Sequence, residues 1–256
     1  MDRVVGMSFS LTNQDLVRYD RQIILPEFGQ EGQKRLRQAT VLIAGAGGLG
    51  SPVGMYLACA GVGRIILVDD ESVDLSNLNR QILYWEEDVG EKKVTSGDRK
   101  LHKLNSTVQV VPVCARITGE NVFDLLDGVH LVIDCLDNME TRFVMNAACF
   151  QKKIPLIHGG VRGLMGEVTT IIPGETPCLE CVFPRRPDRA EPFPVFGATA
   201  GLIASLQVME AIKLIAGFGK LLAGRMLYVN GGDMQFLSIQ MKRNPDCRVC
   251  GENEKG

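Results

Sequence analysis

Three glycines form a G-x-G-x-x-G turn that could bind a phosphate group: Gly45, Gly47 and Gly50. In such a turn the first glycine permits a tight bend, the second lets a phosphate approach the backbone, and the third lets the following helix pack closely. Free N–H groups and the positive end of that helix favour an anion. The pattern predicts a nucleotide site; the alternative is a tight turn in a core without a ligand.

Polar residues follow several of the apolar runs and could complete this site. Asp69 follows the run 64–68, where a carboxylate can accept hydrogen bonds from ribose hydroxyls. Asn77 and Arg80 lie in a polar connection that we expect near the same edge of a sheet. Asp137 and Asn138 follow the run 129–135, and a carboxylate beside a triphosphate is a natural ligand for Mg²⁺. The alternative role for Asp137 is to cap the following helix.

Two C-x-x-C pairs, Cys178 with Cys181 and Cys247 with Cys250, have the spacing of a tetrahedral structural zinc site. The alternative is a pair of redox disulfides. The other cysteines lie within apolar stretches, and we expect them to pack in the core rather than to do chemistry: Cys59, Cys114, Cys135 and Cys149.

The elements that must position these residues alternate between strand and helix patterns. Short apolar runs predict strands at 40–44, 64–68, 108–113, 129–135 and 155–157, with a further strand at 166–172. Helical patterns lie between them at 33–38, 51–60 and 90–104. This alternation predicts an α/β fold with a Rossmann-like, doubly wound and largely parallel sheet. After it, a helix at 201–216 and a hairpin at 225–229 and 235–241 are expected to close the fold.

We therefore expect one domain over residues 1–256 in three parts. The nucleotide-binding part covers 12–172, the first zinc half-site and a crossing segment cover 173–200, and the helix, hairpin and second zinc half-site cover 201–256. With 45% hydrophobic residues, 23% charged residues and a net charge of −2, the chain has no basis for nucleic-acid binding. It shows no signal-peptide pattern and no apolar run that approaches a membrane span, so a cytoplasmic location is expected.

Seven motifs in order resemble the MoeB/ThiF/HesA family, relatives of the ubiquitin-activating enzymes. They are R-Y-D-R-Q-I, G-A-G-G-L-G, S-N-L-N-R-Q, D-C-L-D-N, P-C-L-E-C, S-L-Q-V-M-E-A-I-K and C-R-V-C-G, from about Arg18 to Gly251. The resemblance implies an enzyme that uses ATP to adenylate the C-terminal Gly-Gly of a small ubiquitin-like sulfur carrier for molybdopterin, thiamin or related pathways. It also implies a homodimer with one structural zinc per subunit.

The resemblance also assigns roles to individual residues. Gly48 joins Gly45 and Gly47 in the turn against the phosphates, and Asp69 takes the ribose hydroxyls. Asn77 and Arg80 hold phosphate, and Ser76 belongs to the same cofactor-binding set. Lys93, rather than Lys92, contacts the triphosphate. Asp137 binds Mg²⁺ with Asn138 beside it, and Arg21 is the arginine that the other subunit supplies to the γ-phosphate. The carboxylate of the carrier would attack the α-phosphorus while Mg²⁺, Arg21, Arg80 and Lys93 offset the charge on the departing pyrophosphate.

One departure separates this chain from many members of that family. The cysteine that accepts the activated carrier as a thioester would fall near Ala190, and from Val182 onward the only cysteines are Cys247 and Cys250. We therefore expect adenylation without an enzyme thioester. The acyl-adenylate would go directly to an external sulfur donor, or the physiological acceptor differs from the usual one. Three alternatives remain open: adenylation of a peptide or small-molecule carboxylate, an NAD-dependent oxidoreductase, and a binding module that has lost catalysis.

Overall fold

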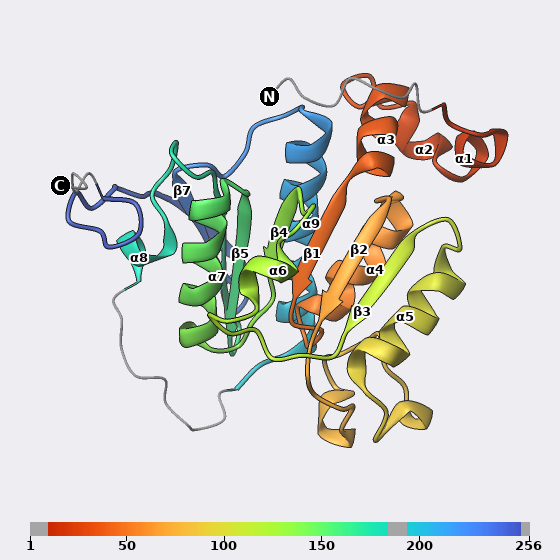
Figure 1. Cartoon of the computed structure of the whole chain (residues 1–256), viewed down its shortest axis with the longest axis horizontal. Coiled ribbons are helices and arrows are strands. Elements are labelled where there is room, and N and C mark those ends of the chain that lie inside the picture. The colour runs from red at the N-terminus through yellow and green to blue at the C-terminus, as the bar shows by residue number, and fades with distance from the viewer. Residues whose placement is uncertain (1–9, 184–193, 252–256) are drawn as a thin grey trace.

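A single eight-stranded sheet runs through the protein in the order β3-β2-β1-β4-β5-β6-β7-β8. Figure 1 labels β1 to β5 and β7 of this sheet. The structure is a computed structural model, and it describes residues 10–183 and 194–251. The strands are β1 (Thr40–Ala44), β2 (Arg64–Val68), β3 (Gln109–Val113), β4 (Leu131–Asp134), β5 (Leu156–Arg162), β6 (Met165–Ile171), β7 (Arg225–Asn230) and β8 (Gln235–Gln240).

The sheet has a parallel half and an antiparallel half. β1 to β5 run parallel, and β6, β7 and β8 then add antiparallel pairs to the edge formed by β5. The chain proceeds outward from β1 to β2 and β3, then returns to the other side of β1 with β4. Ligands of open α/β sheets bind where the strand order reverses in this way, at the carboxyl ends of the strands.

Helices cover both faces of the sheet (Figure 1). One face packs against α3 (Gly29–Gln38), α4 (Gly50–Ala60), α5 (Lys93–Leu104) and α9 (Gly197–Ala216). The other face packs against α6 (Val122–Leu125), α7 (Met139–Lys152) and α8 (Leu179–Val182). Two short helices, α1 (Asn13–Arg18) and α2 (Asp20–Ile23), precede α3. The predicted α/β fold with a largely parallel sheet and a C-terminal hairpin is confirmed.

The sequence of β1 explains why it lies at the centre. All its residues are buried, with Val41 and Ile43 in the apolar cluster beneath α4 and α9 and Leu42 and Ala44 in the cluster beneath α7. A continuous apolar run is what a parallel strand with both faces covered requires. The glycine turn therefore begins at the end of the central, fully buried strand.

Several boundaries differ from those expected. β5 continues to Arg162 because His158 and Gly159 pair with β6, although they are not part of an apolar run. α9 begins at Gly197, four residues earlier than expected, and α5 begins at Lys93 because Lys92 is extended. Arg18 and Arg21 lie on separate short helices, because α1 ends at Arg18 and α2 begins at Asp20.

Among the described residues α9 is the one helix long and apolar enough to cross a membrane, judged by length and composition. The expectation that no apolar run approaches a membrane span is therefore wrong for residues 197–216. α9 packs against β5, β6 and α4, and Ile203, Ala204 and Ala211 are fully buried there. The apolar composition of α9 is accounted for by these contacts within the core.

Candidate functional site

A large cleft opens at the carboxyl ends of the parallel strands. Its volume is about 1520 Å³, above the roughly 300–1,000 Å³ of ordinary small-molecule pockets. Asp69, Asp137 and Phe183 all line it. Apart from Arg21, its lining includes the residues that the resemblance assigns to nucleotide binding: Gly45, Gly47, Gly48, Asp69, Ser76, Asn77, Arg80, Lys93, Asp137 and Asn138. The fold thus brings these residues together, and their individual roles stay predictions.

Two of the glycines are required by the backbone of the turn itself. Gly45 has a φ of +94°, and a Cβ added to it would lie 2.8 Å from the carbonyl oxygen of Cys135. A Cβ at Gly50 would lie 1.9 Å from the carbonyl oxygen of Gly45. By contrast, a Cβ at Gly47 would meet nothing closer than 3.7 Å. The turn therefore needs Gly45 and Gly50 to form, whereas the space at Gly47 is free for a ligand.

Asp69 ties the glycine turn to the end of β2. Its Oδ2 accepts a hydrogen bond from the N–H of Ala46 at 2.8 Å, and its Oδ1 accepts one from the N–H of Glu71 at 2.9 Å. Burial raises the pKa of Asp69, and the positive charge of Lys93 opposes this shift. A carboxylate has about four acceptor positions, so two remain for a ligand.

Lys93 lies almost fully buried in the cleft wall. Its side chain is 2% exposed, and its Nζ pairs with Oε2 of Glu71 at 2.5 Å. The neighbouring Lys92 turns away and donates to the carbonyl oxygen of Asp70 at 2.8 Å. Of the two lysines, only Lys93 lines the cleft.

The connection after β2 brings Arg80 over the glycine turn. Arg80 donates to the carbonyl oxygen of Ser76 at 2.9 Å, and its Cγ would lie 3.6 Å from a Cβ at Gly48. The start of α9 also approaches, since a Cβ at Gly197 would lie 2.5 Å from the carbonyl oxygen of Asn79. The guanidinium group of Arg80 is thereby held beside the turn where a phosphate would sit.

Asp137 and Asn138 have separate tasks after β4. The side chain of Asn138 caps α7 by accepting a hydrogen bond from the N–H of Thr141 at 2.9 Å. Asp137 is exposed in the cleft, and its carboxylate accepts a hydrogen bond of 3.3 Å from Asn138. The alternative that Asp137 caps the helix is therefore wrong, and its carboxylate is left free for a ligand.

Arg21 lies outside the cleft. Its side chain is 93% exposed on α2, and its described ion pair, with Asp20, has a separation of 3.9 Å. A role in the site of its own subunit is not supported by this placement.

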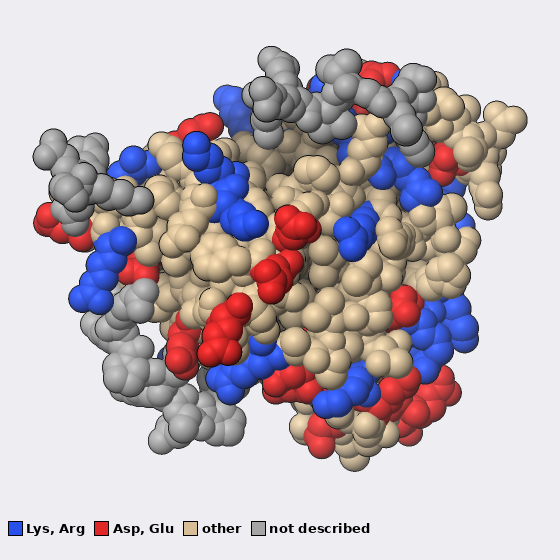
Figure 2. All heavy atoms as spheres, in the orientation of Figure 1, with Lys and Arg blue, Asp and Glu red and all other residues tan. Residues whose placement is uncertain are grey.

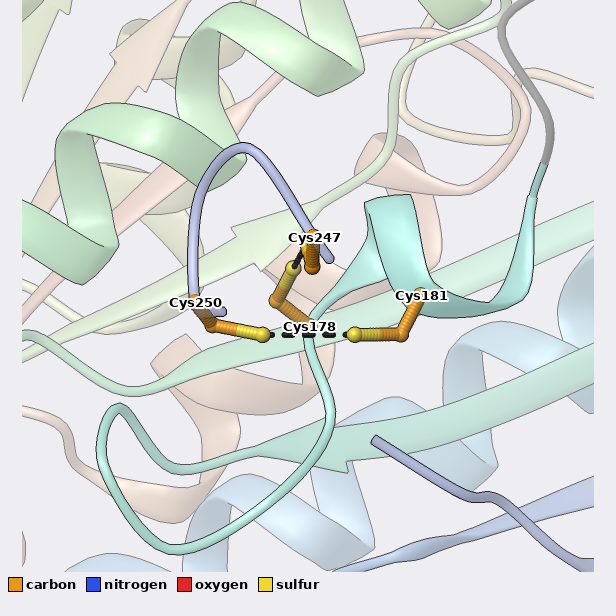
Figure 3. A group of neighbouring side chains, drawn as sticks. All are labelled: Cys178, Cys181, Cys247 and Cys250. Carbon is orange, nitrogen blue, oxygen red and sulfur yellow. Dashed lines mark hydrogen bonds between the residues drawn. The ribbon is translucent and has the colours of Figure 1, made fainter. Parts of the chain in front are cut away.

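The four cysteines of the C-x-x-C pairs come together (Figure 3). Their sulfur atoms all lie within 4.8 Å of one another, with Cys178 and Cys247 at 3.5 Å and Cys181 and Cys250 at 3.2 Å. A tetrahedron with metal–sulfur bonds of about 2.3 Å needs sulfur–sulfur distances of about 3.8 Å. The cluster therefore fits a zinc ion after small side-chain movements, and it could hold one.

The expectation for the remaining cysteines is wrong in two cases. Cys135 and Cys149 are buried as expected, but Cys59 and Cys114 are exposed. Cys59 is on the outer side of α4, and its position near the far end places it about 14 Å along the helix from Gly50. Cys114 directly follows β3 and precedes Ala115, which lines the cleft. Ala190 and the rest of residues 184–193 lie outside the described residues.

Three residues of the cleft wall were not found from the sequence. Glu71 pairs with Lys93, Arg142 donates to the carbonyl oxygen of Leu136, and Phe183 also lines the cleft. Glu71 and Arg142 resemble ordinary surface charges in the sequence, and only the fold brings each to its partner. The face in Figure 2 shows acidic and basic side chains interspersed, without a single basic patch.

The fold and cleft define the class as a Rossmann-like α/β protein with a ligand site at the carboxyl ends of its parallel strands. The sequence profile of the ThiF family matches residues 19–249, and the chain belongs to this family. Protein HesA (vegetative) of Trichormus variabilis is 41% identical, over 96% of this chain and 93% of the relative. The SAMP-activating enzyme E1 of Haloferax volcanii and the sulfur carrier protein adenylyltransferase of Thermus thermophilus are also 41% identical, over 96% and 94% of this chain and 93% of each relative.

Solved structures agree with this assignment. E. coli MccB with MccA-N7isoASN superposes with a TM-score of 0.84 at 26% identity, over 91% of this chain and 74% of that one. E. coli MccB with ATP superposes with a TM-score of 0.80 at 28% identity, over 91% of this chain and 73% of that one. An NAD-dependent oxidoreductase shares the glycine turn but not these likenesses, and we set that alternative aside.

Proposed function

We propose that the protein is an ATP-dependent adenylyltransferase that activates the C-terminal Gly-Gly carboxylate of a small ubiquitin-like sulfur carrier. The main support for this proposal is the cleft, because the glycine turn, Asp137 and Phe183 all line one space. Its volume leaves room for the end of a protein chain beside a nucleotide. The relatives named sulfur carrier protein adenylyltransferase and SAMP-activating enzyme E1 support the same reaction class.

In this proposal the nucleotide lies across the carboxyl ends of β1, β2 and β4. The N–H groups at the start of α4 hold the phosphates, and Asp69 uses its two remaining acceptor positions for the ribose hydroxyls. Ser76, Asn77, Arg80 and Lys93 contact the phosphates from the opposite wall. Asp137 would hold Mg²⁺, which when bound neutralises phosphate charge; the free carboxylate suits this hard cation.

The reaction needs no protein nucleophile. The carrier carboxylate, already ionised, attacks the α-phosphorus of ATP, forming the acyl-adenylate and releasing pyrophosphate. Arg80 and Lys93 offset the charge that develops on the leaving group. Arg21 would be supplied by the second subunit of a homodimer, which agrees with its exposure away from its own cleft. The acyl-adenylate then passes to an external sulfur donor.

The cysteine cluster is proposed to hold a structural zinc ion. All four thiols would be committed as ligands, with no open position for catalysis. Burial raises the pKa of Cys178 to about 11, so metal binding must displace the proton of this thiol. Free thiols without disulfides also suit the proposed cytoplasmic location.

The test is carrier-dependent exchange between ATP and labelled pyrophosphate. A suitable carrier is a small protein ending in Gly-Gly that is encoded by a neighbouring reading frame. We expect exchange with the intact carrier and none with a carrier that lacks its last two glycines. Thermal protection by ATP but not by NAD would accompany it. Absence of exchange with every carrier ending in Gly-Gly would contradict the proposal.

A second candidate is adenylation of a peptide. The missing cysteine near Ala190 favours it. Exchange that depends on a free peptide carboxylate, and that persists without any folded carrier, would identify this activity.

A further inference from the structure

The loop that carries Asp137 is held from below by a buried ion pair. Asp134 at the end of β4 is 1% exposed and Arg142 on α7 is 11% exposed, and Nε of Arg142 lies 3.3 Å from Oδ2 of Asp134. Both side chains form hydrogen bonds with the backbone of Leu136, the residue directly before Asp137. Oδ1 of Asp134 accepts the N–H of Leu136 at 3.0 Å, and the guanidinium group of Arg142 donates to the carbonyl oxygen of Leu136.

Two neighbours fix the ion pair itself. Nδ1 of His158 on β5 donates to Oδ2 of Asp134 at 2.7 Å, and the His158 ring is fully buried. Arg142 also donates to the carbonyl oxygen of Gly159 at 2.9 Å, which joins α7 to β5. Glu167 on β6 adds a carboxylate oxygen 3.7 Å from Nε2 of His158. Three strands and one helix thus converge beneath the loop.

This arrangement differs from ordinary core packing because it satisfies both backbone groups of one loop residue with charged partners. Charge-assisted hydrogen bonds are shorter and stronger than neutral ones, and a forked guanidinium group fixes direction as well as distance. Asp137 itself has little to hold it, since its carboxylate is exposed and its hydrogen bond from Asn138 is 3.3 Å long. The bonds from Asp134 and Arg142 therefore fix the backbone directly before Asp137.

We propose that the Asp134–Arg142 pair, supported by His158, is a positioning device that holds the Asp137 carboxylate in place for its metal ion. The inference rests on the proposed function, since it assumes that Asp137 binds Mg²⁺. Arg142, Asp134 and His158 are positioning residues here: they hold the loop, and they affect the metal ion only through Asp137. His158 is the informative member because it does not line the cleft and cannot touch a substrate.

Two pairs of variants test this. Arg142→Lys keeps the charge but has no fork to serve two carbonyl oxygens and Asp134 together. His158→Leu removes the donor to Asp134, whereas His158→Asn keeps an N–H near the same place. Arg37→Lys is the matched control, because half-buried Arg37 donates to the carbonyl oxygen of Thr107, and Thr107 follows the far end of α5.

The first readout needs no activity. Hydrogen–deuterium exchange over residues 135–138 in the protein without ligand should be faster in Arg142→Lys and His158→Leu, and unchanged in His158→Asn and Arg37→Lys. The second is ATP affinity by calorimetry, with and without Mg²⁺. In Arg142→Lys and His158→Leu, ATP affinity without the metal should stay the same. The Mg²⁺ concentration that gives half of the maximal gain in ATP affinity should rise about ten- to a hundredfold, as it does when other residues that support metal ligands are changed.

Each outcome decides something. If His158→Leu leaves both exchange and Mg²⁺ dependence unchanged while Arg142→Lys changes the second, Arg142 acts on the substrate directly and the positioning role is overturned. If Arg37→Lys shows the same Mg²⁺ shift, the effect is general destabilisation and the inference is also wrong. A wild-type protein without carrier-dependent pyrophosphate exchange would refute the proposed function, and the hydrogen-exchange result would still report on the loop.

Discussion

Two carboxylates of the cleft differ in their surroundings, and this predicts different effects when each is removed. Asp69 is largely buried and bonded to two backbone N–H groups, whereas Asp137 is exposed. Asp69→Ala should weaken ATP binding roughly ten- to a hundredfold, because each charge-assisted hydrogen bond contributes about 1.5–3 kcal/mol. Asp137→Ala should retain more of the binding but abolish pyrophosphate exchange. Calorimetry and exchange assays separate the two; wild-type exchange in Asp137→Ala would remove Asp137 from the mechanism.

The cysteines predict an intermediate that is not attached to the enzyme. Burial raises the pKa of Cys135 and Cys149, so neither is an available nucleophile. Enzyme, ATP, Mg²⁺ and carrier should therefore give a carrier hydroxamate when trapped with hydroxylamine, with the enzyme unmodified by intact-mass spectrometry. Because Cys114 is exposed beside the cleft, Cys114→Ser is the variant to examine first. A thiol-labile adduct that disappears in this variant would refute the prediction.

His158 gives the stability a defined dependence on pH. Burial alone would lower the pKa of His158, but the carboxylates of Asp134 and Glu167 outweigh it and raise this pKa above 6.5, against the charge of Arg142. Protonated His158 therefore stabilises the fold fully below pH 6.5, and this contribution is lost as pH rises through the folded-state pKa. The free energy of unfolding in urea should fall more steeply above pH 6.5 in the wild type than in His158→Asn; parallel curves would argue against a charged ring.

At the scale of elements, two glycines of the turn should differ in their roles: Gly50 is needed for folding, and Gly47 for binding ATP. In Gly50→Ala the new methyl group would meet the carbonyl oxygen of Gly45, so we expect loss of stability together with ATP binding. In Gly47→Ala the methyl group has space, so stability should be kept while ATP affinity falls. Thermal melting with and without ATP measures both effects. Normal ATP protection in Gly47→Ala would show that phosphate does not approach the backbone there.

The sequence predicted those elements whose pattern is local. The apolar run of β1 and the glycines after it identified the centre of the sheet, and paired cysteines identified the cluster. The length of β5 could not be predicted, because His158 and Gly159 are placed in a strand by their pairing with β6. Glu71 and Arg142 were missed for a related reason. The role of each charged side chain depends on a partner on another element, and the sequence does not show that partner.

At the scale of the molecule, the cluster predicts that metal supports the fold before it affects the nucleotide. Cys250→Ser should lower zinc content from about one per chain and lower the melting temperature, while ATP affinity is retained longer. Cys149→Ser is the control, because this buried cysteine lies outside the cluster. Elemental analysis and melting curves test it, and full zinc occupancy in Cys250→Ser would remove that residue as a ligand.

The cluster could also crosslink the unfolded chain. Cys178 and Cys247 are 69 positions apart, and α9, β7 and β8 lie between them. A metal that remained on the thiolates would turn this stretch into a closed ring, and a crosslink of that size removes about 4 kcal/mol of conformational entropy from the unfolded state. The antiparallel half of the sheet ends in β8, whose residues are all exposed. The stability of this antiparallel half would then depend on the availability of zinc as well as on the contacts within the half itself.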